Sequence, residues 1–258
     1  MSSFRALAKA IVPLELQPQR IVDRLITETL RGMIVRGGPF KGMRYTNEGY
    51  GVLAPKLFGT YECELLSVVE PLLKARFDRF IDIGAGDGYY VTGFAIRSRS
   101  REIVAYDASE VVRQMIPEMA VANGVGDRIR LEGWCHPEDL SRELRVGSNL
   151  VLMDVEGAEE VLLDPAQVPE LRNAWILFEA HDVITPGVGG RVVRRFMATH
   201  ESIEIAARYR EPEDITFLPQ FYVKYIRYDL LGRLLERPDK PERMRWFYLS
   251  PKGRSLPI

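Results

Sequence analysis

Residues 80–90 read Phe-Ile-Asp-Ile-Gly-Ala-Gly-Asp-Gly-Tyr-Tyr, an apolar run that breaks into three glycines at alternate positions, Gly84, Gly86 and Gly88. Because glycine has no Cβ, such a loop can take positive φ and lets a ligand approach its backbone. A buried strand followed by a glycine-rich turn and a helix is the nucleotide-binding start of an α/β sheet. The dinucleotide fingerprint needs a third small residue where this sequence has Tyr89, so the pattern disfavours NAD and FAD.

Two carboxylates belong to the same pattern. Asp107 ends a second strand-like segment at 102–107, 21 positions after Gly86, where a βαβ unit places an acid that binds ribose hydroxyls. Asp82 lies inside the apolar run, and a carboxylate there costs free energy unless it is paired or hydrogen-bonded. Asp82 therefore either caps the following turn or binds a cationic amino group of the ligand.

Several motifs of the chain resemble one family. Residues 81–88 resemble motif I of the class I S-adenosylmethionine-dependent methyltransferases, and Tyr106-Asp107 resembles their ribose-binding strand end. Residues 154–159, Asp-Val-Glu-Gly-Ala-Glu, are similar to the signature of FkbM-like methyltransferases, which act mainly on hydroxyl oxygens. Gly59-Thr60-Tyr61-Glu62 and Phe178-Glu179-Ala180-His181 also resemble that family's pattern.

The resemblance, which covers residues 57–206, implies that the cofactor is S-adenosylmethionine. The three glycines would allow backbone approach, Asp82 would bind the methionine end and Asp107 the ribose. Trp134 would lie near the adenine, and Tyr61 and Glu62 would close over the cofactor. The expected cofactor-binding residues are thus Tyr61, Glu62, Asp82, Gly84, Gly86, Gly88, Asp107 and Trp134.

A hydroxyl acceptor has to lose its proton during methyl transfer, which requires a base or a metal. Histidine needs the smallest pKa adjustment to take up a proton near neutrality. Among the three histidines, at 136, 181 and 200, only His181 falls at the end of an expected core strand. The predicted catalytic residues are His181, Asp154 and Glu156, with a purely structural histidine as the alternative.

The same region contains other acids. Asp154, Glu156 and Asp182 could hold Mg²⁺, since hard cations prefer oxygen ligands, but acids also serve as caps and turn formers, so we favour a site without metal. Glu159 and Glu160 read as acids of a first helical turn that complement the helix dipole.

Strand-like and helix-like segments alternate along most of the chain, which predicts an α/β fold. We expect a Rossmann-like, doubly wound, mostly parallel seven-stranded sheet with an antiparallel C-terminal edge. Strands are expected at 79–83, 102–107, 128–132, 149–154, 174–180, 202–206, 221–228 and 246–249. Helices are expected at 19–35, 61–75, 88–97, 111–119 with a kink near Pro117, 157–163 and 191–199. Residues 1–56 should form a helical, turn-rich extension and residues 57–258 the methyltransferase domain.

The charge, cysteine content and hydropathy of the chain restrict the kinds of partner and compartment that it fits. The chain has 35 basic and 36 acidic residues, for a net charge of −1, so it has no general electrostatic attraction to nucleic acid. Cys63 and Cys135 lack metal-ligand spacing, which favours a reducing cytoplasm. No apolar stretch approaches the roughly 20 residues that span a bilayer. Residues 1–50 and 207–258 match no recognised pattern and could serve homodimer formation or recruitment.

These patterns together predict an S-adenosylmethionine-dependent O-methyltransferase that acts on a small-molecule or glycosidic hydroxyl, of a sugar or a secondary metabolite. Two alternatives stay open. One is a non-catalytic binding or scaffold protein that retains the fold. The other is a nicotinamide-dependent oxidoreductase, which Tyr89 disfavours.

Overall fold

The computed structural model describes residues 18–47, 52–223 and 245–257. The chain divides into two compact units. The first unit comprises Met1–Tyr45, Val52–Cys63 and Arg210–Arg237, and the second comprises Thr46–Gly51, Glu64–Tyr209 and Pro238–Ile258. The expected extension at 1–56 and domain at 57–258 stay predictions.

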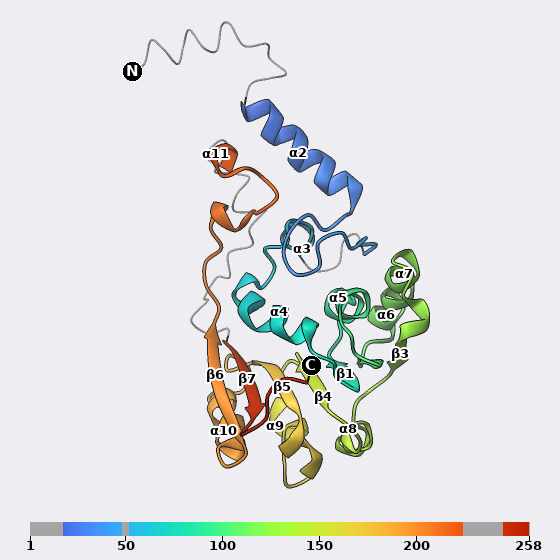
Figure 1. Cartoon of the computed structure of the whole chain (residues 1–258), viewed down its shortest axis with the longest axis vertical. Coiled ribbons are helices and arrows are strands. Elements are labelled where there is room, and N and C mark those ends of the chain that lie inside the picture. The colour runs from blue at the N-terminus through green and yellow to red at the C-terminus, as the bar shows by residue number, and fades with distance from the viewer. Residues whose placement is uncertain (1–17, 48–51, 224–244, 258) are drawn as a thin grey trace, which may run out of the picture. The chain divides into compact units, whose positions relative to one another are not determined.

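The second unit contains a seven-stranded sheet with the order β3-β2-β1-β4-β5-β7-β6 (Figure 1). Its strands are β1 (Arg79–Ile83), β2 (Glu102–Tyr106), β3 (Ile129–Glu132), β4 (Asn149–Met153), β5 (Trp175–Ala180), β6 (His200–Ala206) and β7 (Arg245–Pro251). The neighbours from β3 to β5 pair in parallel, whereas β7 runs antiparallel to both β5 and β6. The predicted mostly parallel sheet with an antiparallel edge is confirmed.

Helices cover the two faces of this sheet, which lies between them in Figure 1. One group of helices that pack against one another consists of α4 (Leu66–Lys74), α5 (Tyr89–Arg97), α6 (Glu110–Arg113) and α7 (Met115–Ala122). The other comprises α8 (Pro137–Leu144), α9 (Glu159–Leu162) and α10 (Val188–Phe196). The helix expected at 111–119 is interrupted at Gln114, between α6 and α7, and α8 is a helix that the sequence patterns did not predict.

The strand register brings the expected site residues to one edge of the sheet. Every residue of β4 and β5 is buried, as expected for central parallel strands that have both faces covered. Ile83, the last residue of β1, is in register with Tyr106 of β2 and Met153 of β4. The residues that follow these three strand ends therefore leave the sheet side by side.

The first unit is built from short helices and turns. Its described helices are α2 (Pro18–Gly32), α3 (Leu53–Phe58) and α11 (Gln220–Val223), and a single bridge joins Ile34 and Arg44. The strand expected at 221–228 is wrong over 221–223, which belong to α11, and residues 224–228 lie outside the described ones. Within the described part of the chain, every helix is too short or too polar to cross a membrane.

Candidate functional site

The glycine loop after β1 is shaped by contacts with both neighbouring strands. The backbone N–H groups of Gly84 and Ala85 both donate to the Tyr106 carbonyl, at 2.9 and 3.0 Å. Gly84 has a φ of +80°, and a Cβ at this position would lie 1.7 Å from the Asp154 carbonyl oxygen. Only glycine therefore fits where the loop crosses the end of β4.

The other two glycines of the loop differ from each other in their surroundings. A Cβ on Gly88 (φ +88°) would lie 3.1 Å from Ile116 and 3.2 Å from Met119, so this glycine permits close packing. A Cβ on Gly86 (φ +54°) would have no neighbour nearer than 4.0 Å. The open space over Gly86 leaves its backbone accessible to a ligand.

Asp107, at the end of β2, ties that strand to the glycine loop. Its Oδ2 accepts the Gly86 N–H at 2.9 Å and its Oδ1 accepts the Ser109 N–H at 2.8 Å. Each carboxylate oxygen can accept more than one hydrogen bond. Asp107 can therefore hold the loop and still accept hydrogen bonds from ligand hydroxyls.

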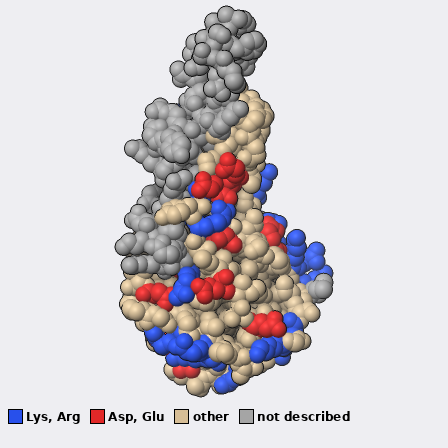
Figure 2. Space-filling view, turned by 90° about the vertical axis from the view of Figure 1, so that its left-hand side faces the viewer, with Lys and Arg blue, Asp and Glu red and all other residues tan. Residues whose placement is uncertain are grey.

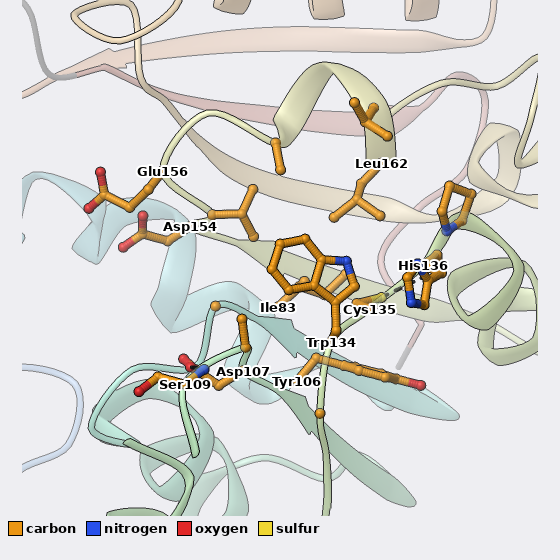
Figure 3. Close-up of a pocket in the computed structure, with 17 residues that line it drawn as sticks. Ile83, Tyr106, Asp107, Ser109, Trp134, Cys135, His136, Asp154, Glu156 and Leu162 are labelled. Carbon is orange, nitrogen blue, oxygen red and sulfur yellow. Dashed lines mark hydrogen bonds between the residues drawn. The ribbon is translucent and has the colours of Figure 1, made fainter. Parts of the chain in front are cut away.

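A cavity of about 400 Å³ opens beside these strand ends. Among its lining residues are Gly84, Asp107, Trp134, Asp154, Glu156 and Leu162 (Figure 3). Figure 3 shows the Trp134 indole among the other lining side chains, and Trp134 as a residue is 63% exposed. Val155, Val161 and Leu162 add an apolar wall. Asp82, Gly86, Gly88 and His181 do not line this cavity.

Asp82 is a buried carboxylate inside β1. It is 1% exposed, and neither of its oxygens has a hydrogen-bond partner among the described residues. Burial raises its pKa well above the ordinary value, and the charges of Asp154, Asp107 and Asp87 add to the effect. The Val91 N–H acts weakly in the opposite direction without a hydrogen bond of normal geometry. An ammonium group of a ligand would supply the missing partner.

His181 follows β5 and lies among four carboxylates. Its Nδ1 makes a short contact with Glu159 Oε1. Its Nε2 lies 3.4 Å from Asp154 Oδ1, 3.5 Å from Glu156 Oε2 and 3.8 Å from Glu179 Oε2. The three predicted catalytic residues are thus brought together, and Nε2 is the atom of the His181 ring that faces Asp154 and Glu156.

The pKa of His181 and that of Asp154 are both raised in this group of side chains. Burial disfavours the charged imidazole, but the hydrogen bond of Glu159 and the charges of Asp154, Glu159 and Glu156 outweigh it and raise the pKa of His181. Burial raises the pKa of Asp154 to about 6, although the charge of His181 acts against this rise. The surroundings therefore raise the pKa of both groups above its ordinary value.

Glu159 is a site residue that the sequence reasoning missed. It begins α9, as expected of a first-turn acid, but its side chain is 0% exposed. The neighbouring Glu160 of α9 instead forms a part-exposed ion pair with Arg191 of α10, at 2.8 Å. No signal in the sequence separates Glu159 from Glu160, because both acids stand in the same first helical turn.

Only some of the acids that could hold Mg²⁺ lie close to His181. Asp182 does not join the group around His181; it accepts a hydrogen bond from Arg245 at 2.6 Å. Ligand-type atoms of Asp154, Glu156 and His181 lie within 4.8 Å of one another, so a cation there would occupy the His181 Nε2. Mg²⁺ stays a prediction that we do not favour.

Tyr61 and Glu62 belong to the first unit. The Lys56 Nζ lies 4.9 Å from the centre of the Tyr61 ring, and Glu62 has a positive φ of +45°. Their expected role over the cofactor stays a prediction.

Comparison with known proteins gives similarity of fold only. No protein-family model and no curated protein matches this sequence. Among solved structures, the O-methyltransferase TomG from Streptomyces achromogenes in complex with S-adenosylmethionine is 12% identical, with a TM-score of 0.45, covering 96% of this chain and 95% of that one. A ribosomal protein L11 methylase from Lactobacillus delbrueckii is 12% identical, with a TM-score of 0.46 and coverage of 75% and 79%.

A precorrin 8W decarboxylase from Methanobacterium thermoautotrophicum is 16% identical, with a TM-score of 0.45 and coverage of 71% and 86%. These three proteins differ in what their names say they act on. At such identities and TM-scores the similarity carries no argument about the reaction of this chain, which has to be argued from the geometry of its own site.

Proposed function

We propose that this protein is an S-adenosylmethionine-dependent methyltransferase that methylates a hydroxyl group of a small molecule, such as a sugar or a secondary metabolite. The observation that carries the proposal is the buried Asp82 carboxylate without a partner, in register one residue before the strand ends that present Gly84 and Asp107. A ligand that carries both a cationic amino group and a ribose would satisfy Asp82 and Asp107 together. A nicotinamide dinucleotide has no such amino group.

The residues present fit this cofactor, which supplies a methyl group on a positively charged sulfur. The open face of Gly86 allows backbone contact, Asp82 would bind the amino group, and Asp107 the ribose hydroxyls. Trp134 and the apolar wall of Val161 and Leu162 would enclose the adenine. Direct displacement needs alignment of the reacting atoms more than covalent help, so positioning supplies much of the catalysis.

The acceptor hydroxyl gives up its proton in this reaction, and we propose His181 as the base that takes it. Its Nε2 faces Asp154 and Glu156, whose charges stabilise the imidazolium that forms. Those charges also disfavour anionic acceptors. On the surface that Figure 2 shows, acidic and basic side chains are interspersed in small groups, which supports a small acceptor over a nucleic acid.

Calorimetric titration tests the cofactor assignment. S-adenosylmethionine and S-adenosylhomocysteine should bind the wild-type chain, whereas NADH should not. Asp107→Ala should weaken binding about tenfold or more, because hydrogen bonds to a charged group contribute about 1.5–3 kcal/mol. Asp127→Ala, which alters an exposed acid in the turn before β3, is the matched control and should bind normally.

The alternatives predict other results. Binding of NADH in place of the adenosyl ligands would support the oxidoreductase. Failure of well-folded wild-type protein to bind either adenosyl ligand would contradict the proposed function and favour the scaffold.

A further inference from the structure

Glu159 carries a charge whose burial needs an explanation. Its side chain is inaccessible to solvent, and a buried carboxylate costs free energy unless its oxygens are hydrogen-bonded. Oε1 accepts the Gly157 N–H at 3.1 Å and contacts the His181 Nδ1, whereas Oε2 has no partner among the described residues. The carboxylate is thus oriented by one backbone group and directed at one side chain.

This contact selects one form of the imidazole ring. An ionised carboxylate only accepts hydrogen bonds, so the His181 Nδ1 facing it must carry the hydrogen. In the neutral ring the lone pair then lies on Nε2. The 3.4–3.8 Å distances from Nε2 to Asp154, Glu156 and Glu179 exceed those of normal hydrogen bonds. Nε2 is therefore held close to the acids without being blocked by them.

We propose that Glu159 is a positioning residue: it holds His181 in the Nδ1–H tautomer, so that Nε2 is the atom that takes the acceptor proton. The inference rests on the proposed function for its consequence, but the tautomer itself is a property of the protein alone. The acceptor oxygen would form its bond to the methyl carbon as the carbon–sulfur bond breaks toward sulfur, and the hydroxyl proton would move to Nε2. Glu159 then stabilises the imidazolium through Nδ1–H.

The charged groups facing His181 come from every element around it. Glu159 lies on α9, Asp154 and Glu156 follow β4, and Glu179 belongs to β5. Asp182, which also follows β5, is already paired with Arg245 of β7. Glu159 is the one that contacts Nδ1, so its replacement should change the tautomer, whereas the other acids act on Nε2.

Nitrogen NMR of histidine-labelled protein tests the tautomer directly. The chain has only three histidines, and His136→Asn and His200→Asn would assign the signals. In wild type above the pKa of His181, Nε2 should be the unprotonated ring nitrogen. In Glu159→Leu, which offers Nδ1 no acceptor, the Nδ1–H form should lose its preference and Nε2 should carry the hydrogen in a larger share of the molecules. A wild-type ring protonated on Nε2 would overturn the inference even if no variant folds.

Turnover measurements complete the test. Glu159→Gln should lower kcat about 100-fold, within the range that general base catalysis contributes, with S-adenosylmethionine affinity unchanged. The acid limb of its pH profile should move to lower pH, because a group that raises the His181 pKa is lost. Glu160→Gln, on the same helix turn, should behave as wild type.

Three outcomes would contradict the inference. One is an unchanged pH profile in Glu159→Gln, and another is an unchanged tautomer in Glu159→Leu. The third is loss of turnover with EDTA and its recovery with Mn²⁺, because His181 would then be a metal ligand. Failure of wild type to bind S-adenosylmethionine would reject the proposed function but leave the NMR result to decide the tautomer.

Discussion

Asp82 is a residue that selection for stability alone would not retain, because its buried carboxyl group has no hydrogen-bond partner among the described residues. A carboxylate whose pKa is raised in the folded state favours folding below its unfolded value of about 3.9 and weakens it as pH rises. Asp82→Asn should therefore be more stable than wild type by about 1 kcal/mol or more at pH 7, while its S-adenosylmethionine affinity falls. Urea unfolding at pH 4 and pH 7, with calorimetry, measures both effects.

Asp78→Asn is the control of opposite sign. The Ser148 N–H donates to Asp78 Oδ2 at 2.9 Å and lowers the pKa of this partly exposed acid. Its replacement should destabilise the protein at pH 7 and lose this effect as the pH falls below about 4. An Asp82→Asn variant with the same stability difference at both pH values would show that the charge is not the cause.

Gly84 and Gly86 should respond differently to alanine, although both have positive φ. At Gly84 the new Cβ would overlap the Asp154 carbonyl, and unfolding experiments should show a loss of about 3 kcal/mol or more. At Gly86 the space is open, so Gly86→Ala should lose only about 1–2 kcal/mol but bind S-adenosylmethionine more weakly. Equal cofactor affinity in Gly86→Ala and wild type would remove this glycine from the binding site.

Helix α8 depends on its first turn, which makes it a test at the scale of an element. The His136 N–H donates to Asp139 Oδ2 at 3.0 Å, and this bond, together with Arg142, lowers the pKa of Asp139 although burial acts against it. Asp139→Ala should cost about 1 kcal/mol at pH 7. A depressed pKa stabilises the fold above the unfolded value, so the cost should vanish as the pH falls below about 4.

Glu138→Ala is the matched control for this helix, because Glu138 is exposed in the same turn. It should leave the denaturation midpoint nearly unchanged. A cost of Asp139→Ala that persists at pH 3 would point to lost packing instead of a lost cap.

Strands were easier to predict from the sequence than helix α8, for a physical reason. The strand expected at 79–83 has those bounds, because strands buried on both faces read as continuous apolar runs. Helix α8 instead buries Glu143, whose carboxylate accepts two hydrogen bonds from Arg130 at 2.7 Å and one from the Tyr106 hydroxyl at 3.1 Å. The residues that neutralise Glu143 are distant in the sequence, so the sequence alone suggests a solvent-exposed charge at this position.

At the scale of the whole molecule, alternation of strands and helices was enough to predict the sheet and its carboxyl edge. In a parallel sheet strand ends meet at one edge, which brought Asp107, Asp154 and His181 into the prediction. Side-chain contacts between residues that are distant in the sequence could not be predicted from this alternation. Glu159 meets His181 across 22 positions, and within the first unit Arg210 donates to the Thr60 carbonyl across 150 positions.

The position of β7 between β5 and β6 has a consequence for how the protein is made. Ribosomal synthesis produces β6 before β7, yet among the described strands β6 pairs with β7 alone. Until residues 245–251 emerge, the nascent chain exposes one unpaired edge on β5 and leaves β6 with no place in the sheet. Unpaired strand edges are sites of aggregation, so β7, which is translated after β6, both joins β6 to the sheet and covers the edge of β5.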